Sequence, residues 1–260
     1  MITKLRFLGT GGGRFSTIFQ SRATGGLYIE SGVKIHIDPG PGAILHMKNY
    51  GINPTKIDYL LISHCHPDHY TDGEILVEGM TQGGRKRRGM LLASKSVLEG
   101  VGDIGPAISK YHKSLINHKH LSPGDFLNLG PVDLEATPSV HSDPTTVGFK
   151  IHTPNGTISY VADTSLSDEV VEAHKGARIL ILPVTRPRNS RIDWHLSTED
   201  AVEFIRKIEP EITFFTHFGL KMVRAEPEIE AYWAQEKSGY RVMAAKDGMR
   251  VSMGSRITVK

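Results

Sequence analysis

One short cluster, His64-Cys65-His66-Pro67-Asp68-His69, constrains this chain more than any other feature, and it directly follows the apolar segment Asp58–Ser63. The apolar segment predicts a buried strand, and Pro67 predicts that a helix begins immediately after it. Imidazole and carboxylate groups are the ligands that zinc prefers in catalytic sites. Because four such residues fall within six positions, we expect a metal site at the end of this strand, rather than a polar loop that is rich in histidine by chance. Cys65 is expected to pack as a small residue and not to bind metal.

The composition is that of an ordinary globular protein, with 39% hydrophobic and 23% charged residues in 260. This length fits a single domain covering residues 1–260. The apolar runs are too short to cross a bilayer, and the first residues lack the apolar stretch of a secretory signal. The single cysteine excludes an intramolecular disulfide, so we expect a cytoplasmic protein. The net charge of +3 permits an anionic substrate without demanding nucleic acid.

Strands and helices are expected to alternate along the whole chain, which favours the α/β class, with two packed sheets covered by helices on the outside. Helices are predicted at 197–208, where Ser197 or Thr198 caps the first turn, and from Pro227 to about Lys237. Short strands are expected around Val242 and Val251. The other predicted strands are Lys4–Leu8, Gly26–Glu30, Lys34–Ile37, Leu91–Ser94, Asp125–Leu129, Val132–Pro138, Val147–His152, Thr157–Val161, Ile179–Val184 and Ile212–Thr216.

The pattern His-x-His-x-Asp-His after an apolar strand resembles the metallo-β-lactamase superfamily of metal-dependent hydrolases. Three later residues match its further motifs in order: His141 in Ser-Val-His-Ser, Asp163 in Tyr-Val-Ala-Asp-Thr, and His217 in Phe-Phe-Thr-His-Phe-Gly. Each of them follows a predicted strand, and together they extend the resemblance over nearly the whole chain. The resemblance implies a four-layer αββα sandwich with the site at one edge of both sheets.

The same resemblance implies a dinuclear site. It assigns one ion to His64, His66 and His141, the other to Asp68, His69 and His217, and a bridging position to Asp163. Asp68 is counted among the catalytic residues as well as among the ligands. Two divalent ions, zinc first with manganese or iron as alternatives, would hold a hydroxide nucleophile between them. Asp38 would orient a ligand histidine or the water, although an Asp before Pro-Gly also simply favours a turn.

The substrate class is suggested by the stretch 193–201, in which His195 precedes Leu-Ser-Thr. This stretch resembles ribonuclease Z and related phosphodiesterases, which implies that His195 protonates the leaving oxygen or stabilises the charged phosphorane. Its alternative is a histidine in the capping region of a helix. Asp163 without a cysteine ligand disfavours β-lactam hydrolysis. His66, where the redox flavodiiron branch has Glu, disfavours iron-dependent oxygen chemistry.

Two further segments bear on an anionic substrate. The turn that contains Gly11, Gly12 and Arg14 resembles the glycine-rich first turn of ribonuclease Z-like proteins, whose backbone N–H groups could meet a phosphate. The basic run Arg85–Arg88 could hold a phosphate backbone or lean over the site, and a solvated loop is equally compatible with it. The histidines outside the motifs are expected to be surface polar residues; they are His112, His118 and His120.

Three functions remain open from the sequence. A phosphodiesterase is favoured, and because residues 79–120 offer no long arm for tRNA, small phosphodiesters and cyclic phosphates are the expected substrates, with RNA as an alternative partner. A hydrolase of carboxylic esters, thioesters or lactones would use the same ligands. A non-catalytic nucleic-acid-binding or scaffold protein is the third, which the complete ligand set disfavours. No membrane partner is expected, and the resemblance implies that homodimers are common.

Overall fold

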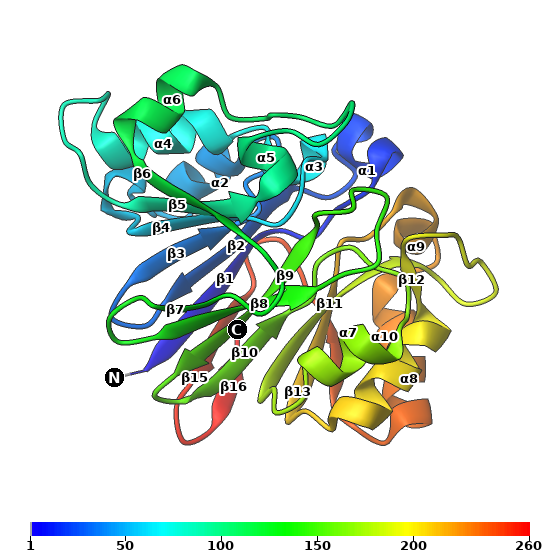
Figure 1. The fold of residues 1–260 in the computed structure, drawn as a ribbon. Coiled ribbons are helices and arrows are strands. Elements are labelled where there is room, and N and C mark those ends of the chain that lie inside the picture. Colours follow the sequence, from blue (N-terminus) through cyan, green and yellow to red (C-terminus); the bar gives the residue numbers. More distant parts are fainter. Residues whose placement is uncertain (1) are drawn as a thin grey trace.

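The computed structural model describes residues 2–260 and shows two facing β-sheets with helices on both outer sides (Figure 1). The first sheet has the strand order β16 (Ile257–Val259), β15 (Arg250–Met253), β1 (Thr3–Gly9), β2 (Thr24–Glu30), β3 (Lys34–Ile37), β4 (Tyr59–Ile62), β5 (Met90–Ser94) and β6 (Asn117–Leu121). The second has the order β14 (Val242–Ala244), β13 (Ile212–Thr216), β11 (Ile179–Arg186), β10 (Gly156–Tyr160), β9 (Val147–Thr153), β8 (Asp133–Pro138) and β7 (Phe126–Asn128), and β12 (Leu196–Ser197) pairs with β11.

Helices cover the outer face of each sheet (Figure 1). The first sheet carries α2 (Ala43–Asn49), η1 (Pro54–Lys56), α3 (Pro67–Tyr70), α4 (Gly73–Thr81), α5 (Lys95–Leu98) and α6 (Lys110–Leu115). The second carries α7 (Asp168–Ala173), α8 (Thr198–Ile208), α9 (Leu220–Arg224) and α10 (Pro227–Ser238), while α1 (Arg14–Phe19) follows β1. The predicted four-layer αββα sandwich is confirmed. Among the described residues, no helix has the length and apolar character needed to span a membrane.

The apolar runs of the central strands serve two cores at once. Leu61 of β4 and Ile181 of β11 lie in the core between the sheets. Their neighbours face outward: Ile62 packs in the core under the first helix layer, and Leu182 in the core under the second. Because successive side chains of a strand point to opposite faces, a strand buried on both faces must be apolar throughout. This explains why the sequence shows continuous runs here and not an alternating pattern.

Parallel pairing brings the chemistry-bearing loops to one edge. Strands β3, β4, β5 and β6 are parallel to one another, as are β10, β11, β13 and β14. Asp38 follows β3 and His64 follows β4, while Asp163 and His217 follow β10 and β13 in the facing sheet. The carboxyl ends of the parallel strands from both sheets therefore meet along a single seam.

The helix α8 begins as predicted, and several other helices were not predicted. Ser197 accepts from the backbone of Asp200 and the Asp200 side chain accepts in return, which is a capping box. In contrast, α1 begins after Gly13 and α2 after Gly42, without a capping side chain. The usual start signal of a helix is thus absent from these segments. Residues 79–120 contribute β5, most of β6 and the helices beside them, so this segment forms part of the sandwich.

Candidate metal centre

Three histidines form the first half of the cluster. The Nδ1 atom of His66 lies 3.0 Å from His64 Nε2 and 3.1 Å from His141 Nε2. A tetrahedral zinc ion with Zn–N bonds near 2.0–2.1 Å separates two nitrogen ligands by about 3.3 Å. The three nitrogens thus lie almost at the spacing that a shared ion requires, and the group is one that could hold a metal.

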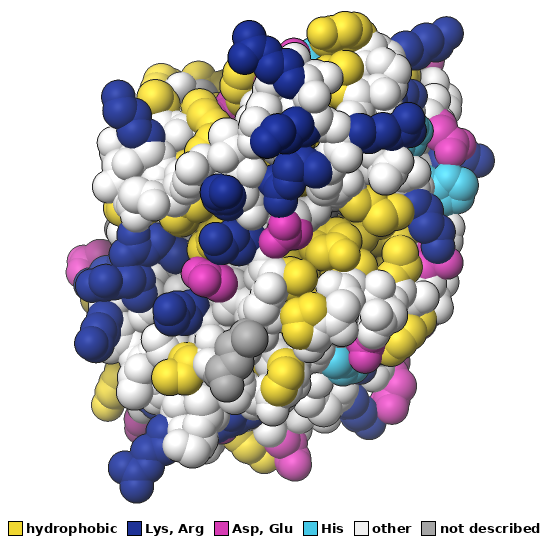
Figure 2. All heavy atoms as spheres, turned by 90° about the vertical axis from the view of Figure 1, so that its left-hand side faces the viewer, with side chains coloured by type: hydrophobic (Ala, Val, Ile, Leu, Met, Phe, Trp, Pro, Cys, Tyr) yellow, Lys and Arg dark blue, Asp and Glu magenta, His cyan; other side chains and the backbone are white. Residues whose placement is uncertain are grey.

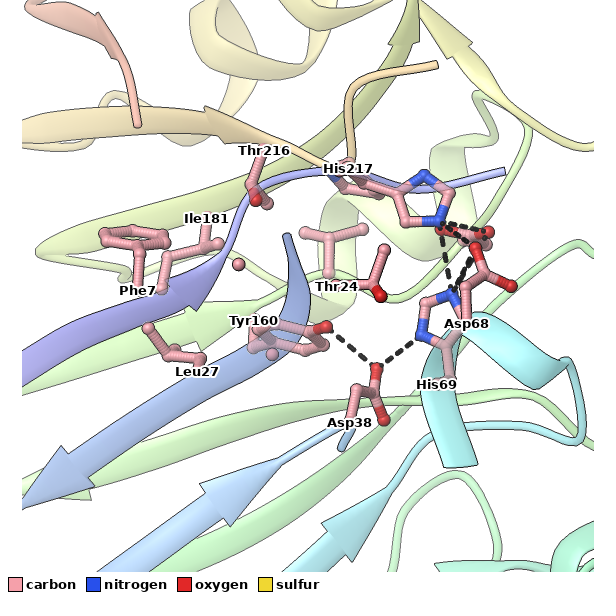
Figure 3. A pocket seen from close by; sticks show the side chains of 16 residues that line it. Phe7, Thr24, Leu27, Asp38, Asp68, His69, Tyr160, Ile181, Thr216 and His217 are labelled. Carbon is pink, nitrogen blue, oxygen red and sulfur yellow. Dashed lines mark hydrogen bonds and ion pairs between the residues drawn. The ribbon is translucent and has the colours of Figure 1, made fainter. Parts of the chain in front are cut away.

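The second half of the cluster combines Asp68 and His69 from α3 with His217 from the facing sheet (Figure 3). The two Nε2 atoms of His69 and His217 are 3.1 Å apart, and Asp68 Oδ2 lies 3.2 Å from His217 Nε2. An oxygen and two nitrogens from different elements therefore converge on a second point, beside the first.

Asp163 lies between the two halves. Its Oδ2 atom is 3.2 Å from His217 Nε2 and 3.6 Å from His69 Nε2, and the residue also groups with His64. Its Oδ1 atom is buried and finds no hydrogen-bond partner among the described residues. A buried carboxylate oxygen without a partner is costly, and a cation bound in the cluster would satisfy it. The donor set thus fits metal ions at both points.

In four of the histidines the Nδ1 atom, which lies on the side of the ring away from the cluster, has a partner that fixes the orientation of the ring. Each Nδ1 lies within hydrogen-bonding distance of an oxygen, so a proton on Nδ1 leaves the Nε2 lone pair directed at the cluster, as in metal-binding histidines generally. The pairs are His64 with Ser63 Oγ at 2.9 Å, His69 with Asp38 Oδ2 at 2.8 Å, His141 with the Trp194 carbonyl at 3.0 Å and His217 with Thr185 Oγ1 at 2.9 Å.

Asp38 is the centre of a buried hydrogen-bond network beneath the second half (Figure 3). Its Oδ1 accepts from the Ser63 backbone N–H at 2.7 Å. Its Oδ2 accepts from the Ser63 hydroxyl, the Tyr160 hydroxyl and His69 Nδ1 at 2.7–2.8 Å. Burial and the adjacent Asp38 carboxylate raise the pKa of Tyr160 well above its usual range, so this phenol remains a donor. These contacts are those of a group that orients His69.

The electrostatics of the two halves differ. Burial lowers the pKa of His64 well below its usual range and that of His141 to about 4, which leaves the neutral imidazoles that bind metal. Burial also opposes charge on His69, yet the Asp68 and Asp38 carboxylates raise its pKa well above the usual range. The carboxylates around the second half therefore favour positive charge there, which a divalent cation would supply.

His195 lies beside both halves. It sits in the loop before α8, with Nε2 3.5 Å from Asp163 Oδ2. Its ring centroid is 5.3 Å from that of His141 and 6.0 Å from that of His217. The side chain is partly exposed, and its Nδ1 lies 3.3 Å from the Asp193 carbonyl. The geometry thus places a partly exposed imidazole directly beside the cluster.

The glycine-rich turn has a different role from the one expected. The N–H groups of Gly11 and Gly12 donate to the carbonyls of Ala23 and Phe218, and that of Gly13 donates to Asp68 Oδ2 at 2.7 Å. These donors are engaged within the chain, so the expectation that they meet a phosphate is not supported. Close approach explains the glycine at position 12, because a Cβ there would overlap the His217 ring. Arg14 is exposed at the start of α1.

Replacing Gly12 with alanine should therefore displace His217. We expect Gly12→Ala to weaken metal binding in the second half of the cluster by about 10- to 100-fold, the range found when the support of a ligand is lost. Competition with a chelator measures this affinity. Gly254→Ala is the matched control, because an added Cβ there meets only Ile2 at 3.9 Å. An unchanged affinity in Gly12→Ala would contradict the close approach.

The basic run Arg85–Arg88 does not lean over the site. Because β4 and β5 are parallel, the connection between them must return to the edge where the strands begin, opposite the cluster. Figure 2 shows lysine and arginine side chains gathered on this far face. Arg88 is held there by Asp58 at 2.7 Å and by the carbonyl of Ile57 at 3.0 Å. His118 and His120 on β6 are exposed, as expected of surface polar residues, whereas His112 on α6 is partly buried against Glu74 and Glu78. None of the three belongs to the groups of described residues that could hold a metal ion.

Asp143 is a buried residue of the site that the sequence reasoning missed. Its Oδ2 accepts from the Cys65 backbone N–H at 2.9 Å and from the Ser96 hydroxyl, while Oδ1 accepts from Thr145. It thus ties the loop that follows His141 to the peptide between His64 and His66. The sequence Asp-Pro-Thr predicts only a local Asx-turn, so nothing in it signals the contact with Cys65.

Asp143→Asn should loosen the first half of the cluster while preserving the shape of the side chain. An asparagine has one accepting oxygen where Asp143 uses two, so the contact with Cys65 or the contact with Thr145 is lost. We therefore expect metal affinity in the first half to fall by about 10- to 100-fold. The visible spectrum of the cobalt-loaded protein should change as well, which a purely structural loss of stability would not cause. Asp125→Asn, which alters another loop aspartate that accepts from a backbone N–H, serves as the control. An unaltered spectrum in Asp143→Asn would contradict the positioning role.

Comparison with known proteins agrees with this geometry. Residues 34–218 match the family model described as a β-lactamase superfamily domain. An uncharacterised protein of Methanocaldococcus jannaschii is 42% identical over 97% of this chain and 96% of its own. A ribonuclease Z of Methanopyrus kandleri is 31% identical over 58% of this chain and 50% of its own.

A solved structure shows the same arrangement of layers. The metallo-β-lactamase fold protein YhfI from Bacillus subtilis superposes with a TM-score of 0.80 at 21% identity, covering 97% of this chain and all of its own. The matched family region contains every residue of the cluster, from His64 to His217. The chain therefore belongs to the metallo-β-lactamase superfamily.

Proposed function

We propose that the protein is a metal-dependent hydrolase of phosphodiesters. The observation that carries the proposal is the position of His195, whose Nε2 lies 3.5 Å from Asp163 Oδ2 beside a cluster of seven ligand-type residues. Hydrolysis of an alkyl phosphodiester expels an alkoxide, which is a poor leaving group without a proton donor. An imidazole beside the cluster can supply that proton.

The ligands are assigned as the distances indicate. His64, His66 and His141 would hold one divalent ion and Asp68, His69 and His217 a second, with Asp163 shared between them. Bound there, divalent ions would acidify a coordinated water and neutralise charge on the phosphate. Other residues would orient the ligands. Asp38 accepts the Nδ1 proton of His69, and the Trp194 carbonyl accepts the Nδ1 proton of His141, so each imidazole presents Nε2 to the ion.

We assign protonation of the leaving group to His195 and binding of the anionic substrate to Arg14. His195 would donate from Nε2 to the departing oxygen. Arg14, which is exposed and directly follows Gly13, would offer a cation to the anion. A similar ribonuclease Z supports the choice of a phosphodiester. The same ligand set would serve carboxylic esters, thioesters or lactones, so substrates of these classes belong in the test.

The purified protein, loaded with zinc or manganese, should hydrolyse bis-p-nitrophenyl phosphate faster than a panel of lactones and thioesters. Metal content is measured on the same sample. Turnover of lactones or thioesters without cleavage of the phosphodiester would move the function to carboxylic substrates. Bound metals without turnover of any substrate would favour a binding protein that has kept the fold.

A further inference from the structure

The helix α1 presents an apolar face to solvent. Phe15, Ile18 and Phe19 are each 64–69% exposed, whereas Ser16 on the opposite side is buried. Their spacing of three and four residues places the three side chains on one side of the helix. Exposed apolar side chains that cluster in this way generally mark a binding surface.

This face is fixed next to the metal cluster. The backbone N–H of Gly13, which precedes the helix, donates to Asp68 Oδ2 at 2.7 Å. Gly12 packs so closely against the His217 ring that a Cβ at this position would overlap the ring. The apolar face therefore begins two residues after a direct contact with the second half of the cluster, and Arg14 stands between them.

A second group of exposed apolar side chains borders the first half of the cluster. Val140, Ile192 and Trp194 are 37–44% exposed. Val140 directly precedes His141, and the Trp194 carbonyl accepts from His141 Nδ1. Ile192 forms a backbone bridge with His195. Exposed apolar residues thus adjoin, along the chain, the backbone contacts of both halves of the cluster. We call these residues the apolar rim: Phe15, Ile18, Phe19, Val140, Ile192 and Trp194.

We infer that the substrate carries an aromatic group, aryl or nucleobase, next to the scissile phosphate and that this group packs on the apolar rim. The inference rests on the proposed function and specifies its substrate class. Two phenylalanines and a tryptophan offer flat faces for stacking with a ring. The α1 face comes from a helix of six residues, which is about 9 Å long. That length suits one ring system better than an extended acyl chain.

Two substrates with the same leaving group test the inference: phenyl p-nitrophenyl phosphate and methyl p-nitrophenyl phosphate. The metal-loaded protein should prefer the phenyl ester. In the double variant Phe15→Ala/Phe19→Ala the ratio of the two kcat/KM values should fall about tenfold, in line with the loss of stacking on one ring. The matched control is Ile229→Ala/Tyr232→Ala, which removes two exposed apolar side chains from α10 and should keep the wild-type ratio.

Binding without turnover provides a second readout. Phenylphosphonate and methylphosphonate both present an anion but cannot be hydrolysed at the phosphorus–carbon bond. Calorimetry should show that the wild type binds phenylphosphonate about tenfold more tightly than methylphosphonate. The double variant should bind the two phosphonates equally. If both phosphonates bind the wild type equally, the inference is wrong.

The outcomes separate the inference from the proposed function. If neither ester is hydrolysed while the preference for phenylphosphonate persists, the phosphodiesterase proposal fails and the apolar rim stands. If the double variant loses activity equally toward both esters, the apolar rim does not select the ring. If sedimentation shows a wild-type dimer that the double variant dissociates, without any change in the ester ratio, a second copy of the chain covers the rim and the inference is overturned.

Discussion

Asp163→Ala is expected to remove at least one metal ion per chain and to lower phosphodiester turnover by well over 100-fold. Loss of an outer residue that merely supports a ligand typically costs 10- to 100-fold, and Asp163 contacts both halves of the cluster. Its Oδ2 lies 3.2 Å from His217 Nε2, and burial raises its pKa less than the nearby His217 and His69 lower it, so it is ionised. Elemental analysis of the purified variant measures the metal content.

Asp168→Ala provides the control for Asp163→Ala. Asp168 is an exposed aspartate of α7 whose partner is Lys207, and it lies outside the cluster. Its removal should leave metal content and turnover unchanged. A full metal complement with normal turnover in Asp163→Ala would show that the two halves are held without it, and the assignment of a shared carboxylate would have to be abandoned.

His195→Ala should lower turnover by roughly 10²- to 10⁴-fold while leaving metal content unchanged, because the variant loses a proton donor and no ligand. The size of the loss should depend on the leaving group. A nitrophenolate departs readily without a proton, whereas an alkoxide does not, so esters with alkyl leaving groups should suffer most. Rates for a series of leaving groups in the wild type and the variant measure this dependence.

The exposed histidine His118 on β6 supplies the control for His195→Ala, since His118→Ala should match the wild type for every leaving group. A uniform loss across the series would assign His195 to positioning rather than to proton transfer. Depletion of metal in His195→Ala would instead make it a ligand or a structural residue of the cluster.

The motif residues were predictable because their spacing is local or follows a strand. His64, His66, Asp68 and His69 lie within one turn after β4, so the chain itself brings them together. His141, Asp163 and His217 could be found only through family resemblance, because no local rule indicates which strand end faces the cluster. The central strands are buried on both faces, so they are apolar along their whole length, and this is why continuous apolar runs predicted them well.

Contacts between residues that lie far apart in the chain could not be predicted from the sequence. Asp143 acts on Cys65 over 78 positions and Thr185 on His217 over 32. A carbonyl such as that of Trp194 carries no residue-type signal at all. The position of Arg85–Arg88 depends on the direction in which β5 runs, and the short α1 lacks a capping side chain. These features depend on topology and packing rather than on composition.

The seam between the two sheets has a thermodynamic consequence. One sheet contributes His64 to His69 to the cluster, and the other contributes His141, Asp163 and His217. An ion bound by both would favour the folded chain by mass action, and each tenfold rise in free metal above the dissociation constant would add about 1.4 kcal/mol to the free energy of unfolding. The melting temperature of this protein should therefore report metal binding: it should rise with the concentration of free metal and fall when a chelator is added.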